Sequence, residues 1–167
     1  TFSKPNEESI NLIQGFGVEG DAHAGKTVKH RYLVGKDPTR LNIRQVHLIH
    51  AELLDELNAK GFSVAPGQLG ENITTRGVDL LDMPTGTKMH IGSDVIIELT
   101  ALRNPCVQID AFQKGMLKEV LYKDKEGNLV RRTGVMGTIH KGGLVKPGDE
   151  IVVELPPEPH SPLEYVW

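Results

Sequence analysis

The sequence predicts a mostly β (α+β) fold, namely a partly closed antiparallel β-barrel with a few short helices around it. Strand-like apolar segments outnumber helix-like ones along the 167 residues. The 18 glycines and 10 prolines exceed their usual combined share of about 12% and are spread along the chain. Short turns separate most of the expected strands, and short turns join antiparallel neighbours.

The strands follow from alternating or continuous short apolar runs bounded by turn residues. Gly92 and Ser93 form the clearest tight hairpin, and the residues between 14 and 42 are expected to be loop because glycines interrupt them. Strands are expected at residues 10–13, 43–49, 72–75, 88–91, 94–102, 129–132, 135–140 and 150–155.

Helices are expected at three places. In residues 50–60, Leu53, Leu54 and Leu57 fall on one face, and Gly61 supplies the stop. A second short helix is expected to begin at Asn104 and to reach residue 112, and a third amphipathic piece covers residues 116–122.

Composition limits the function. The net charge of −3 argues against a nonspecific nucleic-acid binder. No apolar run approaches the ~18 residues of a membrane span, so no membrane is expected as a partner. A single cysteine excludes an internal disulfide and suits a cytoplasmic protein. Residues 1–155 are expected to form one domain, with residues 156–167 as a proline-rich tail outside the core.

A phosphate-loop pattern occurs near the start of the chain, where residues 20–27 read GDAHAGKT. A true phosphate loop needs a buried strand before it and a long helix after it. Here the preceding residues are glycine-rich, and the following ones lack an amphipathic period. A glycine-rich surface turn and a different site role therefore stay open beside nucleotide binding.

Cys106 is the candidate reactive residue. With Asn104 as N-cap and Pro105 at the first helical position, Cys106 would lie in the first turn of a helix. The helix dipole and Arg103 would then favour a thiolate, which can act as a nucleophile, a redox group or a soft-metal ligand. The alternative is a small buried hydrophobe, the commonest role of a lone cysteine.

Five segments in order carry a resemblance. Residues 17–25 read GVEGDAHAG, residues 44–46 RQV, residues 67–73 GQLGENI, residues 103–106 RNPC and residues 148–149 GD. Together they resemble the MOSC domain, a family named after the C-terminal domain of molybdenum cofactor sulfurases. The resemblance covers residues 15 to 155 and accounts for the phosphate-loop match as coincidence.

The resemblance implies a barrel fold and a molybdenum cofactor, that is, a pterin whose dithiolene holds the metal. It implies that Cys106 ligates molybdenum. Pyridoxal phosphate is not expected, because no aminotransferase-like domain fits in this chain. Six further residues are candidate cofactor contacts, and a structural role stays open for all of them except Arg103: Arg44, Arg103, Asp21, His23, Glu71 and Asn72.

The family implies an oxidoreductase that acts on N-hydroxylated or similar N–O compounds. Its partners would be a small-molecule substrate and an external electron donor. Two alternatives stay open: a non-redox sulfur (persulfide) carrier or cofactor-handling module with a sulfur-transfer partner, and the phosphate-loop nucleotide binder. The basic loop at residues 26–31 matches no family motif, and its role is open.

Overall fold

A computed structural model of the chain describes residues 4, 9–20, 42–105 and 107–165. Strands predominate over helices, as the sequence predicts. In chain order the elements are β1 (Ile10–Ile13), β2 (Gly17–Val18), β3 (Val46–His50), α2 (Ala51–Ala59), β4 (Ile73–Thr75), the 3-10 helix η1 (Leu80–Asp82), β5 (Lys88–Ile91), β6 (Val95–Leu102), α3 (Gln108–Phe112), α4 (Leu117–Val120), β7 (Leu121–Lys123), β8 (Leu129–Arg131), β9 (Val135–Lys141), β10 (Gly143–Val145) and β11 (Ile151–Glu154).

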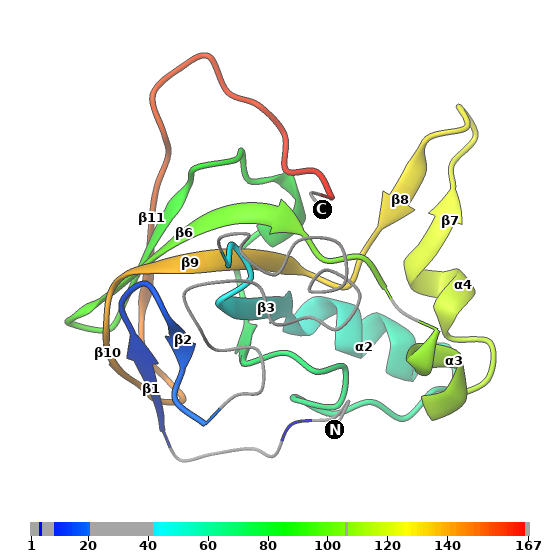
Figure 1. Cartoon of the computed structure of the whole chain (residues 1–167). Coiled ribbons are helices and arrows are strands. Elements are labelled where there is room, and N and C mark those ends of the chain that lie inside the picture. Colours follow the sequence, from blue (N-terminus) through cyan, green and yellow to red (C-terminus); the bar gives the residue numbers. More distant parts are fainter. Residues whose placement is uncertain (1–3, 5–8, 21–41, 106, 166–167) are drawn as a thin grey trace.

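A six-stranded sheet in the order β11-β5-β6-β9-β3-β4 curls into a half-barrel (Figure 1). Its neighbouring strands are antiparallel except for β3 and β4, which run parallel. A smaller sheet, β10-β1-β2, lies beside it, and β7 and β8 form a separate hairpin. The partly closed, largely antiparallel barrel is thus confirmed, with one parallel pair that the short-turn argument misses.

The curl comes from β6 and β9. Alternate residues of β6 are buried, and the β6–β9 register shifts twice, which bends paired strands. Gly137 allows the two strands to approach, because a Cβ atom there would lie 2.7 Å from Ile97 Cγ2. The buried residues of the alternation in β6 include Val95, Ile97 and Leu99, which belong to the main core.

A second core lies under the helices. α2 buries Leu53, Leu54 and Leu57 as its 3.6-residue period predicts, and it ends before Gly61, whose φ is +99°. The buried side chains of α3 and α4, with Met116, complete this cluster. No helix within the described ranges has both the length and the apolarity needed to cross a bilayer.

Several expectations need correction. Strand β2 lies within the expected loop, and strand β10 is an additional strand that the sequence does not predict. Strands of two or three residues are too short to show an alternating pattern. Both strands form because they pair with β1. α4 gives way to strand β7 after Val120, so the third helical piece is shorter than expected. The tail does not stay outside the core: it returns to the end of β6 (Figure 1), where Leu163 is 5% exposed in the main core.

The last correction concerns the start of α3. The helix begins at Gln108, with Val107 as its N-cap residue, and not at Asn104. The Asn104 side chain instead accepts a hydrogen bond from Arg131 Nε at 2.8 Å. This contact to β8 replaces the expected capping role, and position 106 precedes the helix in sequence instead of falling in its first turn.

Candidate functional site

The turn at residues 66–72 is held against β3 by Asn72. The backbone N–H of Asn72 donates to the carbonyl oxygen of His47 at 2.8 Å, and Asn72 Oδ1 accepts from the backbone N–H of His47 at 2.9 Å. The two bonds lie where the parallel pairing of β3 with β4 begins. The side-chain carbonyl of Asn72 thus fixes the turn that carries Glu71.

Arg103 links the same turn to the strand that leads to the cysteine. Its Nη1 donates to the carbonyl oxygen of Leu69 at 2.5 Å, and its backbone N–H donates to the carbonyl oxygen of Gly134 at 3.0 Å. Lys4, near the N-terminus, also contacts this turn: its backbone N–H donates to the carbonyl oxygen of Gly67 at 2.8 Å. Two motifs far apart in sequence are therefore joined through one guanidinium.

His47 lies between these motifs and was not expected to belong to the site. It is 5% exposed, and its Nε2 donates to the carbonyl oxygen of Thr133 at 2.7 Å. Burial, and after it the positive charge of Arg103, hold the pKa of His47 well below 6.5. His47 is therefore neutral at pH 7. In sequence it resembles any residue of a buried strand, so no local signal marks it.

Glu71 is buried and only partly hydrogen-bonded. It is 2% exposed, and its Oε2 accepts from Thr74 Oγ1 at 3.0 Å. Its Oε1 is also buried, and no described group donates to it. A buried oxygen without a donor is costly and uncommon, so Glu71 is a position where a ligand can complete the hydrogen bonding.

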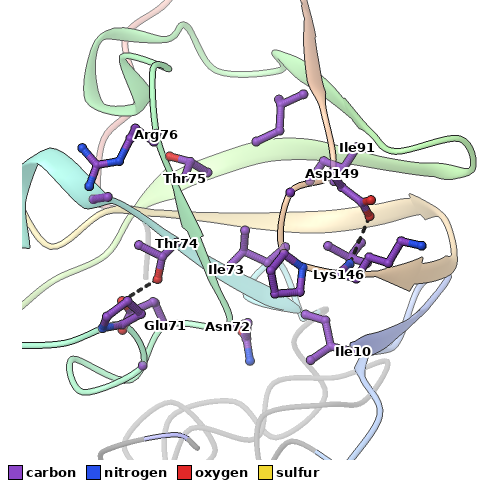
Figure 2. A pocket seen from close by; sticks show the side chains of 17 residues that line it. Ile10, Glu71, Asn72, Ile73, Thr74, Thr75, Arg76, Ile91, Lys146 and Asp149 are labelled. Atoms are coloured by element: carbon purple, nitrogen blue, oxygen red, sulfur yellow. Dashed lines mark hydrogen bonds between the residues drawn. The ribbon is translucent and has the colours of Figure 1, made fainter. Parts of the chain in front are cut away.

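A pocket of about 510 Å³ opens beside Glu71. The turn at 66–72, strand β4 and the loop between β10 and β11 form its walls, together with Ile10 and Ile91. Figure 2 shows Glu71 and Thr74 at one side of it and Asp149 and Lys146 at the other. Its volume lies in the range of about 300–1,000 Å³ that small-molecule sites occupy.

Arg44 lies apart from this pocket and contacts the C-terminal segment. Its guanidinium is 5.3 Å from the centroid of the Tyr165 ring, and that of Arg131 is 5.0 Å from the same centroid. Arg131 also holds Asn104, two residues before the cysteine. The pocket lining includes Glu71 and Asn72 but neither Arg44 nor Arg103, so the structure does not bring the four described candidate contacts to one site.

Three candidate residues, Cys106, Asp21 and His23, lie outside the described residues, as does most of the phosphate-loop pattern. Within the part of the chain that is described, no three His, Cys, Asp or Glu side chains gather as metal ligands. The described residues fit a pterin in two respects. Glu71 Oε1 needs an N–H donor, and the pocket has the volume of a site for a ring compound.

Comparisons with known proteins agree with this architecture. YuaD from Bacillus subtilis is 24% identical, with a TM-score of 0.74 over 96% of this chain and 89% of that one. YiiM from Escherichia coli is 15% identical, with a TM-score of 0.61 over 92% of this chain and 65% of that one. YiiM from Geobacillus stearothermophilus is 19% identical, with a TM-score of 0.55 over 66% and 54%.

At these low sequence identities, the similarity in structure establishes a shared fold. The chain spans less than two thirds of the length of either YiiM protein. No curated protein sequence matches the chain. The profile of the MOSC domain matches residues 21–152, which is most of the sequence and contains the motifs joined around His47. The chain therefore belongs to the MOSC domain family.

Proposed function

We propose that this chain is a molybdenum-cofactor-binding domain and an oxidoreductase that acts on N-hydroxylated or similar N–O compounds. Cys106 supplies a thiolate ligand to the metal. The proposed cofactor contacts are Glu71 and Asn72 at the pocket, Arg103 on the turn that carries them, Arg44 near the C-terminal segment, and Asp21 and His23 earlier in the chain. An external electron donor and a small-molecule substrate are its partners, and the cytoplasm is the expected compartment.

The main support for this proposal is the contact by which Arg103 links two motifs that are far apart in the sequence. Its backbone leads to the cysteine two residues beyond Asn104, while its guanidinium holds Leu69 of the turn that carries Glu71. Arg103 thereby joins the turn that carries the proposed ring-binding carboxylate to the segment that continues in sequence toward Cys106. Arg103, three residues before Cys106 in the sequence, is a source of positive charge that would favour a thiolate.

The protein residues have three tasks in this proposal. Glu71 accepts a hydrogen bond from the ring, Arg103 holds the turn against the segment that follows β6, and the thiolate of Cys106 holds the metal. When bound, the cofactor supplies a metal that changes oxidation state and exchanges oxygen. Neutral His47 supports the turn through its backbone and adds no charge beside Arg103.

Metal content and turnover test the proposal. Full-length protein purified from a cofactor-producing host should contain close to one molybdenum per chain, and it should reduce an N-hydroxylated base with reduced methyl viologen as donor. Cys106→Ala should remove most of both. Val107→Ala is the matched control, because Val107 is adjacent and 78% exposed; it should keep both.

Two results would contradict the proposal. Absence of molybdenum from both the wild type and Val107→Ala would exclude it. A mass increase of about 32 Da on Cys106 after incubation with a cysteine desulfurase, in protein without metal, would favour the persulfide carrier instead. If the protein binds a nucleotide and Lys26→Ala abolishes that binding, the phosphate-loop function would be supported instead.

A further inference from the structure

The β7–β8 hairpin forms a small sheet of its own and projects away from the two larger sheets (Figure 1). Leu121 pairs with Arg131, and Lys123 pairs with Leu129. Residues that pair directly across two strands point to the same side of a sheet, so these four side chains share one face, called here the hairpin face. Leu129 is 47% exposed, and Lys123 is exposed as well. The hairpin face therefore presents apolar surface beside two cations.

Positive charge is concentrated in this part of the chain. Residues 107–132 contain six lysines and arginines and four acidic residues, whereas the whole chain has a net charge of −3. One of the four acids, Glu119, is already paired with Lys60 at 2.8 Å. Within the described part of the chain, no carboxylate forms an ion pair with Lys123 or Arg131. The hairpin face is thus a positive region of a molecule that is negative as a whole, and it attracts negatively charged surfaces.

The base of the hairpin contacts the segment that continues in sequence toward Cys106. Arg131 Nε donates to Asn104 Oδ1 at 2.8 Å, and the Arg131 guanidinium lies 5.0 Å from the centroid of the Tyr165 ring. Asn104 belongs to the motif at residues 103–106. The hairpin face therefore starts at the motif that contains the proposed metal ligand and extends outward from it.

We infer that the hairpin face is the docking surface for an acidic electron-carrier protein. The inference rests on the proposed function and deepens it, because it gives the external electron donor a surface and a charge. Lys123 and Arg131 attract the acidic surface of the carrier, and Leu129 packs against apolar atoms at the centre of the contact. Redox encounters between proteins use small interfaces, below about 1,200 Å², so a single hairpin face can form the centre of one.

The electron balance explains why a carrier must dock. Reduction of an N-hydroxylated base to the amine and water consumes two electrons and two protons. The reduced carrier gives up the electrons and is oxidised, and the protons come from solvent. Opposite charges on the two proteins raise the rate of encounter and fix the orientation of docking, which is what repeated electron delivery requires.

Flavodoxin, a small acidic flavin carrier, is the probe, and calorimetry on the full-length protein measures its binding at low ionic strength. The wild type should bind it, and Lys123→Glu should weaken binding roughly 10-fold. The difference should shrink at high ionic strength, because salt screens exposed charges. Lys141→Glu is the matched control, since Lys141 is exposed at the last position of β9, outside the hairpin; it should bind like the wild type.

Leu129→Ala tests the apolar part of the hairpin face. It should weaken flavodoxin binding by a factor that persists at high ionic strength, because salt does not screen apolar contacts. Its melting temperature should stay within about 2 °C of the wild type, since Leu129 is exposed. Leu144→Ala is the matched control, because Leu144 is 66% exposed on β10.

Turnover with two donors separates this inference from the proposed function. Reduced methyl viologen is a small molecule that needs no protein docking surface. Lys123→Glu should therefore keep the wild-type rate with methyl viologen and lose roughly 10-fold in kcat/KM with reduced flavodoxin. Equal kcat/KM values with flavodoxin, while methyl viologen supports turnover, would overturn the inference and leave the proposed function standing.

The binding results decide the remaining cases. Absence of flavodoxin binding to the wild type would overturn the inference, as would equal binding by Lys123→Glu and Lys141→Glu. Self-association of the wild type that Lys123→Glu abolishes would identify a second copy of the chain as the occupant, which also overturns it. Flavodoxin binding that depends on Lys123 in protein without molybdenum would support the docking surface and reject the proposed function.

Discussion

His47 is a buried imidazole surrounded by positive charge. Its position between the carbonyl oxygen of Thr133 and the guanidinium of Arg103 makes the neutral form the stable one at pH 7. Its backbone holds Asn72, so a residue that no motif includes supports the turn that carries Glu71. The sequence marks the motif residues on either side of it, and tertiary structure adds the residue that joins them.

The depressed pKa of His47 predicts a loss of stability in acid. The unfolded chain binds a proton near pH 6.5 that the folded chain does not bind, so the free energy of unfolding should fall as pH drops below about 6.5. The slope approaches about 1.4 kcal/mol per pH unit for one such group. His47→Gln should flatten this slope in urea unfolding measured from pH 7.5 to 5.

His50 is the expected source of the slope that remains in this variant, because burial also lowers its pKa. Leu155→Ala, which removes no titratable group and lies at an exposed position, is the control and should keep the wild-type pH dependence. An unchanged slope in His47→Gln would show that the imidazole of His47 is protonated in the folded state.

At the scale of elements, the approach of β9 to β3 depends on Gly134. Gly134 has φ of +88°, and a Cβ atom there would lie 2.0 Å from the carbonyl oxygen of Leu48. Its own carbonyl oxygen accepts the backbone N–H of Arg103. The glycine therefore brings β3, β9 and the segment that follows β6 together, which a count of turn residues does not reveal.

Gly134→Ala and Gly127→Ala should differ sharply. Both positions have positive φ, but a Cβ atom at Gly127 meets nothing within 4 Å. Gly127→Ala should lower the free energy of unfolding by about 1 kcal/mol, the cost of the left-handed conformation. Gly134→Ala adds a backbone clash and should cost more than about 4 kcal/mol or prevent folding. Chemical denaturation measures both, and equal losses would contradict the steric argument.

At the scale of the whole molecule, the C-terminal segment closes one end of the half-barrel. The backbone N–H of Leu102 donates to the carbonyl oxygen of Glu164 at 2.8 Å, and that of Thr85 donates to the carbonyl oxygen of Ser161 at 2.7 Å. Tyr165 then reaches the guanidinium groups of Arg44 and Arg131. The proline-rich stretch before these residues is exposed, so it connects β11 to this docked end.

Leu163 should be the main anchor of this segment. Leu163→Ala is expected to lower the free energy of unfolding by about 2–5 kcal/mol, because it removes a buried side chain from the main core. Leu155→Ala is the control: Leu155 is 54% exposed, and the loss should stay within about 0.5 kcal/mol. Equal, small losses in thermal or urea unfolding would show that the segment does not contribute to the core.

The sequence by itself determined the strand-rich class, α2 and the β5–β6 hairpin, because these depend on local periods and on turn residues such as Gly61 and Gly92. It also determined the family, since ordered motifs survive at low overall identity. Only the tertiary structure decided that Asn104 bonds Arg131 rather than capping a helix, that β3 pairs parallel with β4, and that Leu163 is core. It likewise decided that Glu71 and Asn72 line the same pocket. These features are contacts between distant segments, and their energies depend on partners that no local pattern encodes.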